Sequence, residues 1–82
     1  MIIPEIYRRH LEEFQSLWEH RFALRQAPDL TAADLQDWDA RIREHLDGLL
    51  VPGRDAIDTL LAAITDGDTA VEFAAAFVLL RI

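Results

Sequence analysis

The chain contains no cysteine, no lysine and a single serine among its 82 residues. Without cysteine it can form neither a disulfide framework nor a thiolate metal site. The lone Ser16 has no surrounding motif typical of a nucleophilic serine. A membrane-spanning helix needs roughly twenty consecutive apolar residues, whereas the longest apolar segment, residues 70–82, has thirteen and contains Glu72 and Arg81. These absences argue against a disulfide-rich scaffold, a serine hydrolase and a membrane-spanning protein.

Nothing at the start of the chain resembles a secretory signal. The apolar run Met1–Pro4 is too short, and acidic Glu5 follows it where a signal would need a longer apolar region. The lack of cysteine fits a reducing compartment. We therefore expect the protein to be cytoplasmic.

Positive charge is also scarce. All eight cations are arginine, against fifteen acidic residues, so the formal net charge is −7. Residues 26–82 hold four arginines and eleven acids, whereas residues 1–25 hold four of each. An acidic chain without a basic stripe lacks the phosphate contacts that dominate nucleic-acid binding, and it is disfavoured at anionic membrane surfaces. We expect neither nucleic acid nor membrane as a partner.

Hydrophobic periodicity predicts four helices, and the first runs from about Pro4 to Arg25. Pro4 suits the first helical turn, where its missing N–H leaves no bond unmade. Apolar residues recur every three or four positions along this helix, which places on one face Tyr7, Leu11, Phe14, Trp18 and Phe22. We expect this face to be the core side; the alternative is that its aromatic residues line a partner-binding groove, since exposed aromatic side chains are common interface anchors.

The second helix has the clearest start. Thr31 is the expected N-cap, with Asp34 near the capping-box position. Leu30 and Leu35 occupy the two positions of a hydrophobic staple. Gly48 is the expected stop. Since a short turn joins two long amphipathic helices, they are predicted to form an antiparallel hairpin.

The second half of the chain predicts a shorter helix pair. After a Pro-Gly break, the third helix runs from Arg54 to about Thr65, with a buried face that comprises Ile57, Leu60, Leu61 and Ile64. Thr69 and Glu72 match a capping box, so the fourth helix is expected to start there and to continue beyond Ile82.

These elements predict an all-α fold in which the two halves form one compact unit. Residues 1–50 are the long antiparallel helical hairpin, which acts as an N-terminal cap and has Trp18 and Trp38 among its core anchors. Residues 51–82 are a shorter HEAT-like helix pair, which we expect to be the first and truncated part of an array. Short paired helices are the repeating unit of α-solenoids, and each needs a neighbour to bury its face.

The fourth helix is apolar on every side, and such a helix must be covered by protein all round. The roughly seventy residues that precede it are expected to be too few for this. We therefore predict a partner-binding surface formed by Phe73, Phe77, Val78 and Leu80. Its expected occupant is protein, either further repeats of the same polypeptide or a second copy in a homo-oligomer.

The three histidines raise the question of a metal site. His10 and Glu13 lie at i,i+3 on the first helix, a spacing that can place two ligands on one face. A metal site needs three or four convergent ligands and the known spacing motifs are absent, so no metal or cofactor is expected. A metal- or small-ligand-binding bundle that uses His10, Glu13 and His20 stays as the alternative. His45, near the end of its helix, is interpreted as favourable to the helix dipole.

The remaining polar groups predict no chemistry. Asp37 and Asp39 are close in sequence but point to different sides of a helix. Residues 66–69 (DGDT) lack the later ligands of a calcium loop and are explained by a turn and an N-cap. We expect no catalytic residue and no enzymatic activity.

Several stretches together resemble the N-terminal segment of an uncharacterised bacterial family that has HEAT-like repeats further along and genes that often lie beside type VI secretion clusters. They are Ile3–Phe14, Leu17–Arg21, Asp29–Thr31 and His45–Leu49, with Phe73–Ala76 where the repeats would begin. The resemblance implies a non-enzymatic protein-binding scaffold, an adaptor or immunity factor with a secretion-related protein as partner, and it transfers no active site. A further hypothesis is that the protein neutralises an effector, with the acidic surface of residues 29–47 binding a basic toxin.

Overall fold

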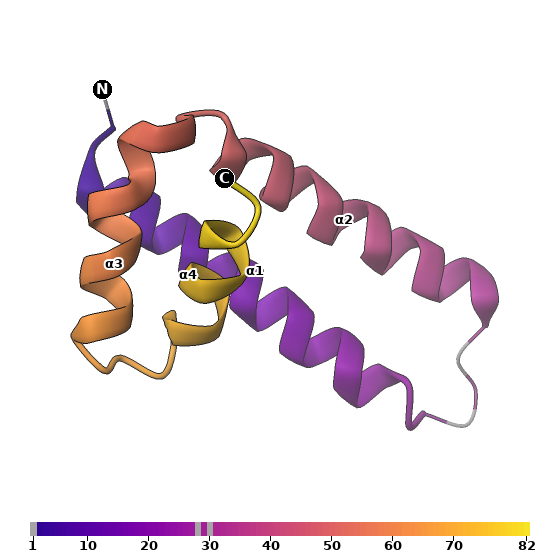
Figure 1. The fold of residues 1–82 in the computed structure, drawn as a ribbon. Coiled ribbons are helices and arrows are strands. Elements are labelled where there is room, and N and C mark those ends of the chain that lie inside the picture. The colour runs from indigo at the N-terminus through magenta and orange to yellow at the C-terminus, as the bar shows by residue number, and fades with distance from the viewer. Residues whose placement is uncertain (1, 28, 30) are drawn as a thin grey trace.

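The structure is a computed structural model that describes residues 2–27, 29 and 31–82. Its elements, in chain order, are α1 (Pro4–Leu24), α2 (Ala32–Leu50), the short 3₁₀ turn η1 (Gly53–Ala56), α3 (Ile57–Thr65) and α4 (Glu72–Leu79). The two long helices α1 and α2 run antiparallel, and α3 and α4 lie against one end of this hairpin (Figure 1). The all-α fold and the long helical hairpin are confirmed.

Helix α1 organises the molecule, since it contacts α2, α3 and α4. The core gathers where all four helices meet and includes Phe14, Leu49, Leu60 and Val78, all almost fully buried. The other end of the hairpin, around the α1–α2 connection, extends beyond α3 and α4 (Figure 1). Apolar side chains at that end therefore have fewer neighbours to cover them.

This arrangement corrects the predicted core face of α1. Tyr7, Leu11 and Phe14 are buried as expected, but Trp18 and Phe22 are exposed. Periodicity identified the correct side of the helix, but α3 and α4 reach only part of its length.

The start of α2 has the capping box that the sequence predicts. The Thr31 hydroxyl oxygen accepts a hydrogen bond from the Asp34 N–H at 3.2 Å, and the Asp34 carboxylate accepts one from the Thr31 N–H at 3.1 Å. The staple expected between Leu30 and Leu35 lies outside the described residues, because Leu30 is not among them. The predicted stop at Gly48 is wrong: α2 continues to Leu50.

The third helix also differs from its prediction. Its expected first residues form η1, so α3 begins only at Ile57. Leu60 is buried, but Leu61 is 46 % exposed, and Ala63 takes the second buried position of α3 instead. The face of α3 that meets α1 and α4 therefore differs in part from the face that periodicity predicts.

The predicted capping box of α4 is absent. Val71 is the N-cap residue and offers no side-chain cap. The acceptor comes instead from α1, where the Gln15 side-chain oxygen accepts a hydrogen bond from the Ala74 N–H at 3.1 Å. Gln15 also donates to the Thr69 carbonyl at 2.5 Å. Helix α4 ends at Leu79 rather than continuing through the last residues.

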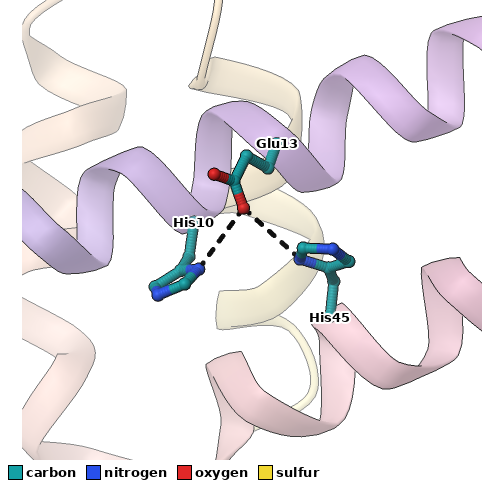
Figure 2. A group of neighbouring side chains, drawn as sticks. All are labelled: His10, Glu13 and His45. Carbon is teal, nitrogen blue, oxygen red and sulfur yellow. Dashed lines mark ion pairs between the residues drawn. The ribbon is translucent and has the colours of Figure 1, made fainter.

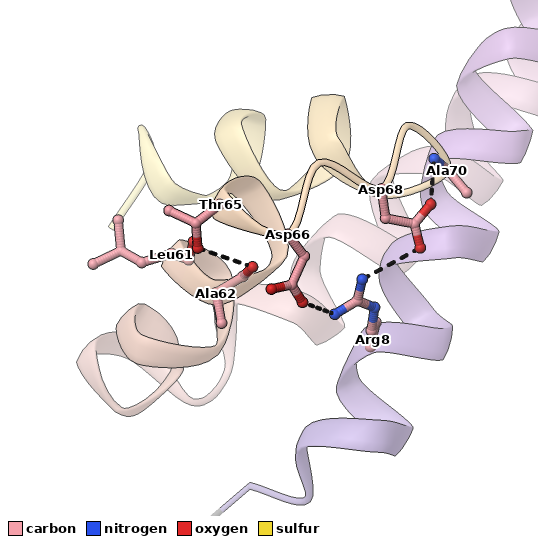
Figure 3. Close-up of polar contacts among 7 residues, drawn as sticks. All are labelled: Arg8, Leu61, Ala62, Thr65, Asp66, Asp68 and Ala70. Carbon is pink, nitrogen blue, oxygen red and sulfur yellow. Dashed lines mark hydrogen bonds and ion pairs between the residues drawn. The ribbon is translucent and has the colours of Figure 1, made fainter.

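A forked ion pair fastens the α3–α4 turn to α1 (Figure 3). Arg8 donates to the Asp66 carboxylate at 2.9 Å and to the Asp68 carboxylate at 3.2 Å. Asp68 also accepts from the Ala70 N–H at 3.0 Å. This backbone hydrogen bond and, after it, the Arg8 guanidinium hold the pKa of Asp68 below its usual range. The segment 66–69, predicted as a turn and an N-cap, therefore forms a turn whose two carboxylates hold it against α1.

Tyr7 ties the two long helices together, since its hydroxyl donates to the Leu49 carbonyl at 2.7 Å in the core. Burial raises the pKa of Tyr7 to about 12, against about 10 in an unfolded chain. Because the folded pKa is the higher one, this group contributes stability below about pH 10 that is lost as the pH rises through 12.

We predict that the raised pKa of Tyr7 is directly measurable by phenolate absorbance, because Tyr7 is the only tyrosine in the chain. The ionisation midpoint is expected near 12 in the native protein and near 10 in concentrated urea. Equal midpoints in the two solutions, with native circular dichroism kept at high pH, would contradict the buried hydrogen bond.

Candidate functional site

Helices α1 and α4 bring four aromatic side chains into one cluster. Phe14, in the core, has its ring centroid 5.6 Å from that of Phe77. Phe77 lies 5.8 Å from both Trp18 and Phe73. Trp18 and Phe73 stack on each other at 6.0 Å, with 27° between their planes. The aromatic cluster therefore extends from the interior to the surface. The distances between its ring centroids are those of favourable aromatic pairs.

The outer part of this aromatic cluster is exposed to solvent. Trp18 is 37 % exposed and Phe73 42 % exposed. Phe22 follows Trp18 by four residues on α1, so it lies on the same side of the helix, and it is 66 % exposed. We call Trp18, Phe22 and Phe73, together with the half-buried Phe77, the aromatic surface. Aromatic residues exposed together in this way are typical anchors of protein interfaces.

The four residues predicted to bind a partner have different environments. Phe73 is exposed, Leu80 is 85 % exposed and Phe77 is half-buried. The Arg81 guanidinium carbon lies 3.6 Å from the centre of the Phe77 ring and covers part of it. Val78 is fully buried within the chain, so its place in the predicted surface is corrected. It packs inward from α4 with Ala74 and Ala75.

Trp18 and Phe22 belong to the exposed surface, although the sequence placed them in the core. Their spacing is that of a core-facing stripe. Exposure depends on where neighbouring helices end, and no local pattern in α1 encodes that.

A second group of polar side chains lies on the hairpin itself (Figure 2). On α1, the His10 Nδ1 lies 3.5 Å from a carboxylate oxygen of Glu13. On α2, the His45 Nδ1 lies 3.9 Å from the same oxygen. Ligand atoms of all three residues lie within 4.8 Å of one another. We call these three residues the histidine cluster.

The cluster changes the residues considered for metal binding. His20, the expected third ligand, is elsewhere: it stacks on Trp38 at 5.9 Å with 8° between the rings, and its Nδ1 lies 3.1 Å from the Ser16 carbonyl oxygen. His45, which the sequence suggested only as a helix-dipole residue, joins His10 and Glu13. Only the register of the two antiparallel helices brings it there.

Part of the acidic stretch 29–47 is already engaged within the chain. Asp39 forms an ion pair with Arg21, and this hydrogen bond holds the pKa of Asp39 below its usual range. Asp34 caps α2. The exposed carboxylates of Asp37, Glu44 and Asp47 remain on the surface of this helix.

Comparison with protein-family models, curated proteins and solved structures finds no match to this chain. In the part of the chain that the structure describes, every helix is too short or too polar to cross a membrane.

Proposed function

We propose that the chain is a non-enzymatic protein–protein interaction module whose docking face is the aromatic surface. The supporting observation is the joint exposure of Trp18, Phe22 and Phe73 on two adjacent helices. Burial of one large apolar side chain contributes about 1.5–3 kcal/mol. Trp18, Phe22 and Phe73 are already partly buried, so each can contribute only part of this free energy, and the remaining contacts of the interface must offset the rest of the cost of association.

The proposed partner is a protein that presents an apolar helix face. Helices α1 and α4 bury only part of the aromatic cluster between them. An amphipathic helix can pack its apolar face on the part that stays exposed. The resemblance to the HEAT-repeat family extends the proposal: the chain caps a helical-repeat scaffold, and the scaffold is an adaptor or immunity factor associated with type VI secretion. In that arrangement the first occupant of the aromatic surface is the next repeat.

The test compares two variants of the isolated chain. The double substitution Phe22→Ser with Phe73→Ser removes two exposed anchors, whereas Leu61→Ser removes an exposed leucine of α3 and serves as the control. We expect the wild type and the control to bind a hydrophobic dye and to associate as concentration rises in sedimentation experiments. The double variant is expected to lose most of both signals while its circular dichroism stays native.

A wild-type chain that remains monomeric and binds no dye would refute the aromatic surface as a docking face. Salt separates this mode from contact between the acidic residues 29–47 and a basic protein. Association through aromatic anchors should persist at 1 M salt, where the screening length is about 3 Å. Binding that disappears at high salt would favour the acidic helix instead.

A further inference from the structure

We propose that His10, Glu13 and His45 form a binding site for a divalent transition-metal ion of the zinc type, which links α1 to α2. Two imidazoles and one carboxylate are a known zinc ligand set, with the fourth position open to water or an exogenous ligand. The proposal does not depend on the aromatic surface, because the two groups share no residue.

The distances between the ligand atoms are close to those of a bound ion. Zinc–nitrogen and zinc–oxygen bonds of about 2.0–2.1 Å at tetrahedral angles place ligand atoms about 3.4 Å apart. The Glu13 carboxylate oxygen lies 3.5 Å from the His10 nitrogen and 3.9 Å from the His45 nitrogen. The two imidazole centroids lie 6.5 Å apart. The ligand atoms lie within 4.8 Å of one another, so binding of an ion requires the side chains to rotate closer together.

The backbone holds these ligands in place. His10 and Glu13 share one face of α1, because residues three apart are neighbours on a helix. His45 faces them across the hairpin (Figure 2). Close to the cluster, the buried hydrogen bond from Tyr7 to Leu49 fixes the separation and register of α1 and α2. The site therefore lies on the rigid part of the hairpin, as a preorganised ligand set requires.

A cavity beside the cluster gives a metal-bound ligand room. It has a volume of ≈ 320 Å³ and is lined by Tyr7, His10, Glu44, His45, Gly48 and Leu49. Apart from its chain neighbours and the nearby backbone of α2, no atom lies within 4 Å of where a side chain would begin at Gly48, so the wall there is open. Glu44 adds a carboxylate to the lining. The cavity contributes an accessible fourth coordination position.

The test titrates zinc and cobalt ions into untagged protein at neutral pH, followed by calorimetry and by the visible absorption of cobalt. We expect one ion per chain and the intense cobalt bands of a four- or five-coordinate site. His10→Ala, His45→Ala and Glu13→Gln should each weaken zinc binding at least about tenfold, since loss of even an outer-shell partner costs 10–100-fold. His20→Ala, a histidine on the same helix outside the cluster, is the matched control and should bind zinc as the wild type does.

Circular dichroism of each variant should stay native, because His10 and Glu13 are exposed and His45 is only half-buried. Acidification should release the ion, because imidazole binds metal only when unprotonated. Three results would overturn the site: no saturable binding of one ion, an octahedral cobalt spectrum, or equal weakening by His20→Ala. The Phe22→Ser, Phe73→Ser variant should keep wild-type zinc affinity, so failure of the aromatic surface is distinguishable from failure of this site.

Discussion

Replacing Phe14 with alanine is expected to destabilise the protein by about 3–5 kcal/mol, the usual cost of emptying an aromatic position in a core. Phe14 has no exposed surface and contacts the ring of Phe77 on α4. A domain of this size has a free energy of unfolding of about 4–12 kcal/mol. The substitution should therefore remove a large share of the stability, measurable as a lower midpoint in urea denaturation followed by circular dichroism.

Phe22→Ala is the matched control, because it is the same substitution on the same helix and on the face that periodicity assigns to the core. Since Phe22 is mostly exposed, its replacement should change the free energy of unfolding by less than about 0.5 kcal/mol. The comparison should be made at low protein concentration, where association through the aromatic surface does not add stability. Similar losses at the two positions would mean that α1 is covered along its whole length, contrary to the structure.

Replacing Gln15 with leucine is expected to destabilise the protein by about 1–3 kcal/mol, because the buried Ala74 N–H loses the side-chain acceptor that Gln15 supplies. The Thr69 carbonyl loses a donor at the same time. The effect should be concentrated at the first turn of α4. Amide hydrogen exchange should therefore accelerate there more than in the middle of α2.

Gln36→Leu controls for the gain of an apolar side chain, since Gln36 is exposed on α2. It should leave the free energy of unfolding within about 0.5 kcal/mol of the wild type. Gln15→Glu separates the two bonds, because a carboxylate still accepts from Ala74 but cannot donate to Thr69. Unchanged exchange in α4 of the leucine variant would show that α4 does not depend on a cap supplied by α1.

The contrast between the two helix starts shows what a local pattern can predict. Thr31 and Asp34 cap α2 with atoms three residues apart, and the sequence identifies both. The acceptor for α4 lies 59 residues before the N–H that it satisfies. Thr69 and Glu72 fit a capping pattern, yet Gln15 takes the role because packing brings α1 against the start of α4.

The histidine cluster shows the same limit. The sequence identifies His10 and Glu13 as neighbours because helical periodicity alone places residues i and i+3 together. It suggested His20 as the third ligand, while the structure supplies His45. Which residue of α2 faces His10 depends on the register of the hairpin, and that register is set by buried contacts such as the Tyr7–Leu49 hydrogen bond.

The sequence by itself determined the all-α class, the start of α2 and the side of α1 that faces inward, because these depend on interactions between residues a few positions apart. The long hairpin was predictable because a short turn joins two amphipathic helices. Tertiary structure alone decided that Phe14 is buried and Phe22 exposed, that Val78 packs inward beside an exposed Phe73, and that His45 meets Glu13. Burial and convergence depend on where separate helices meet and end, and that is fixed by the packing of the whole chain.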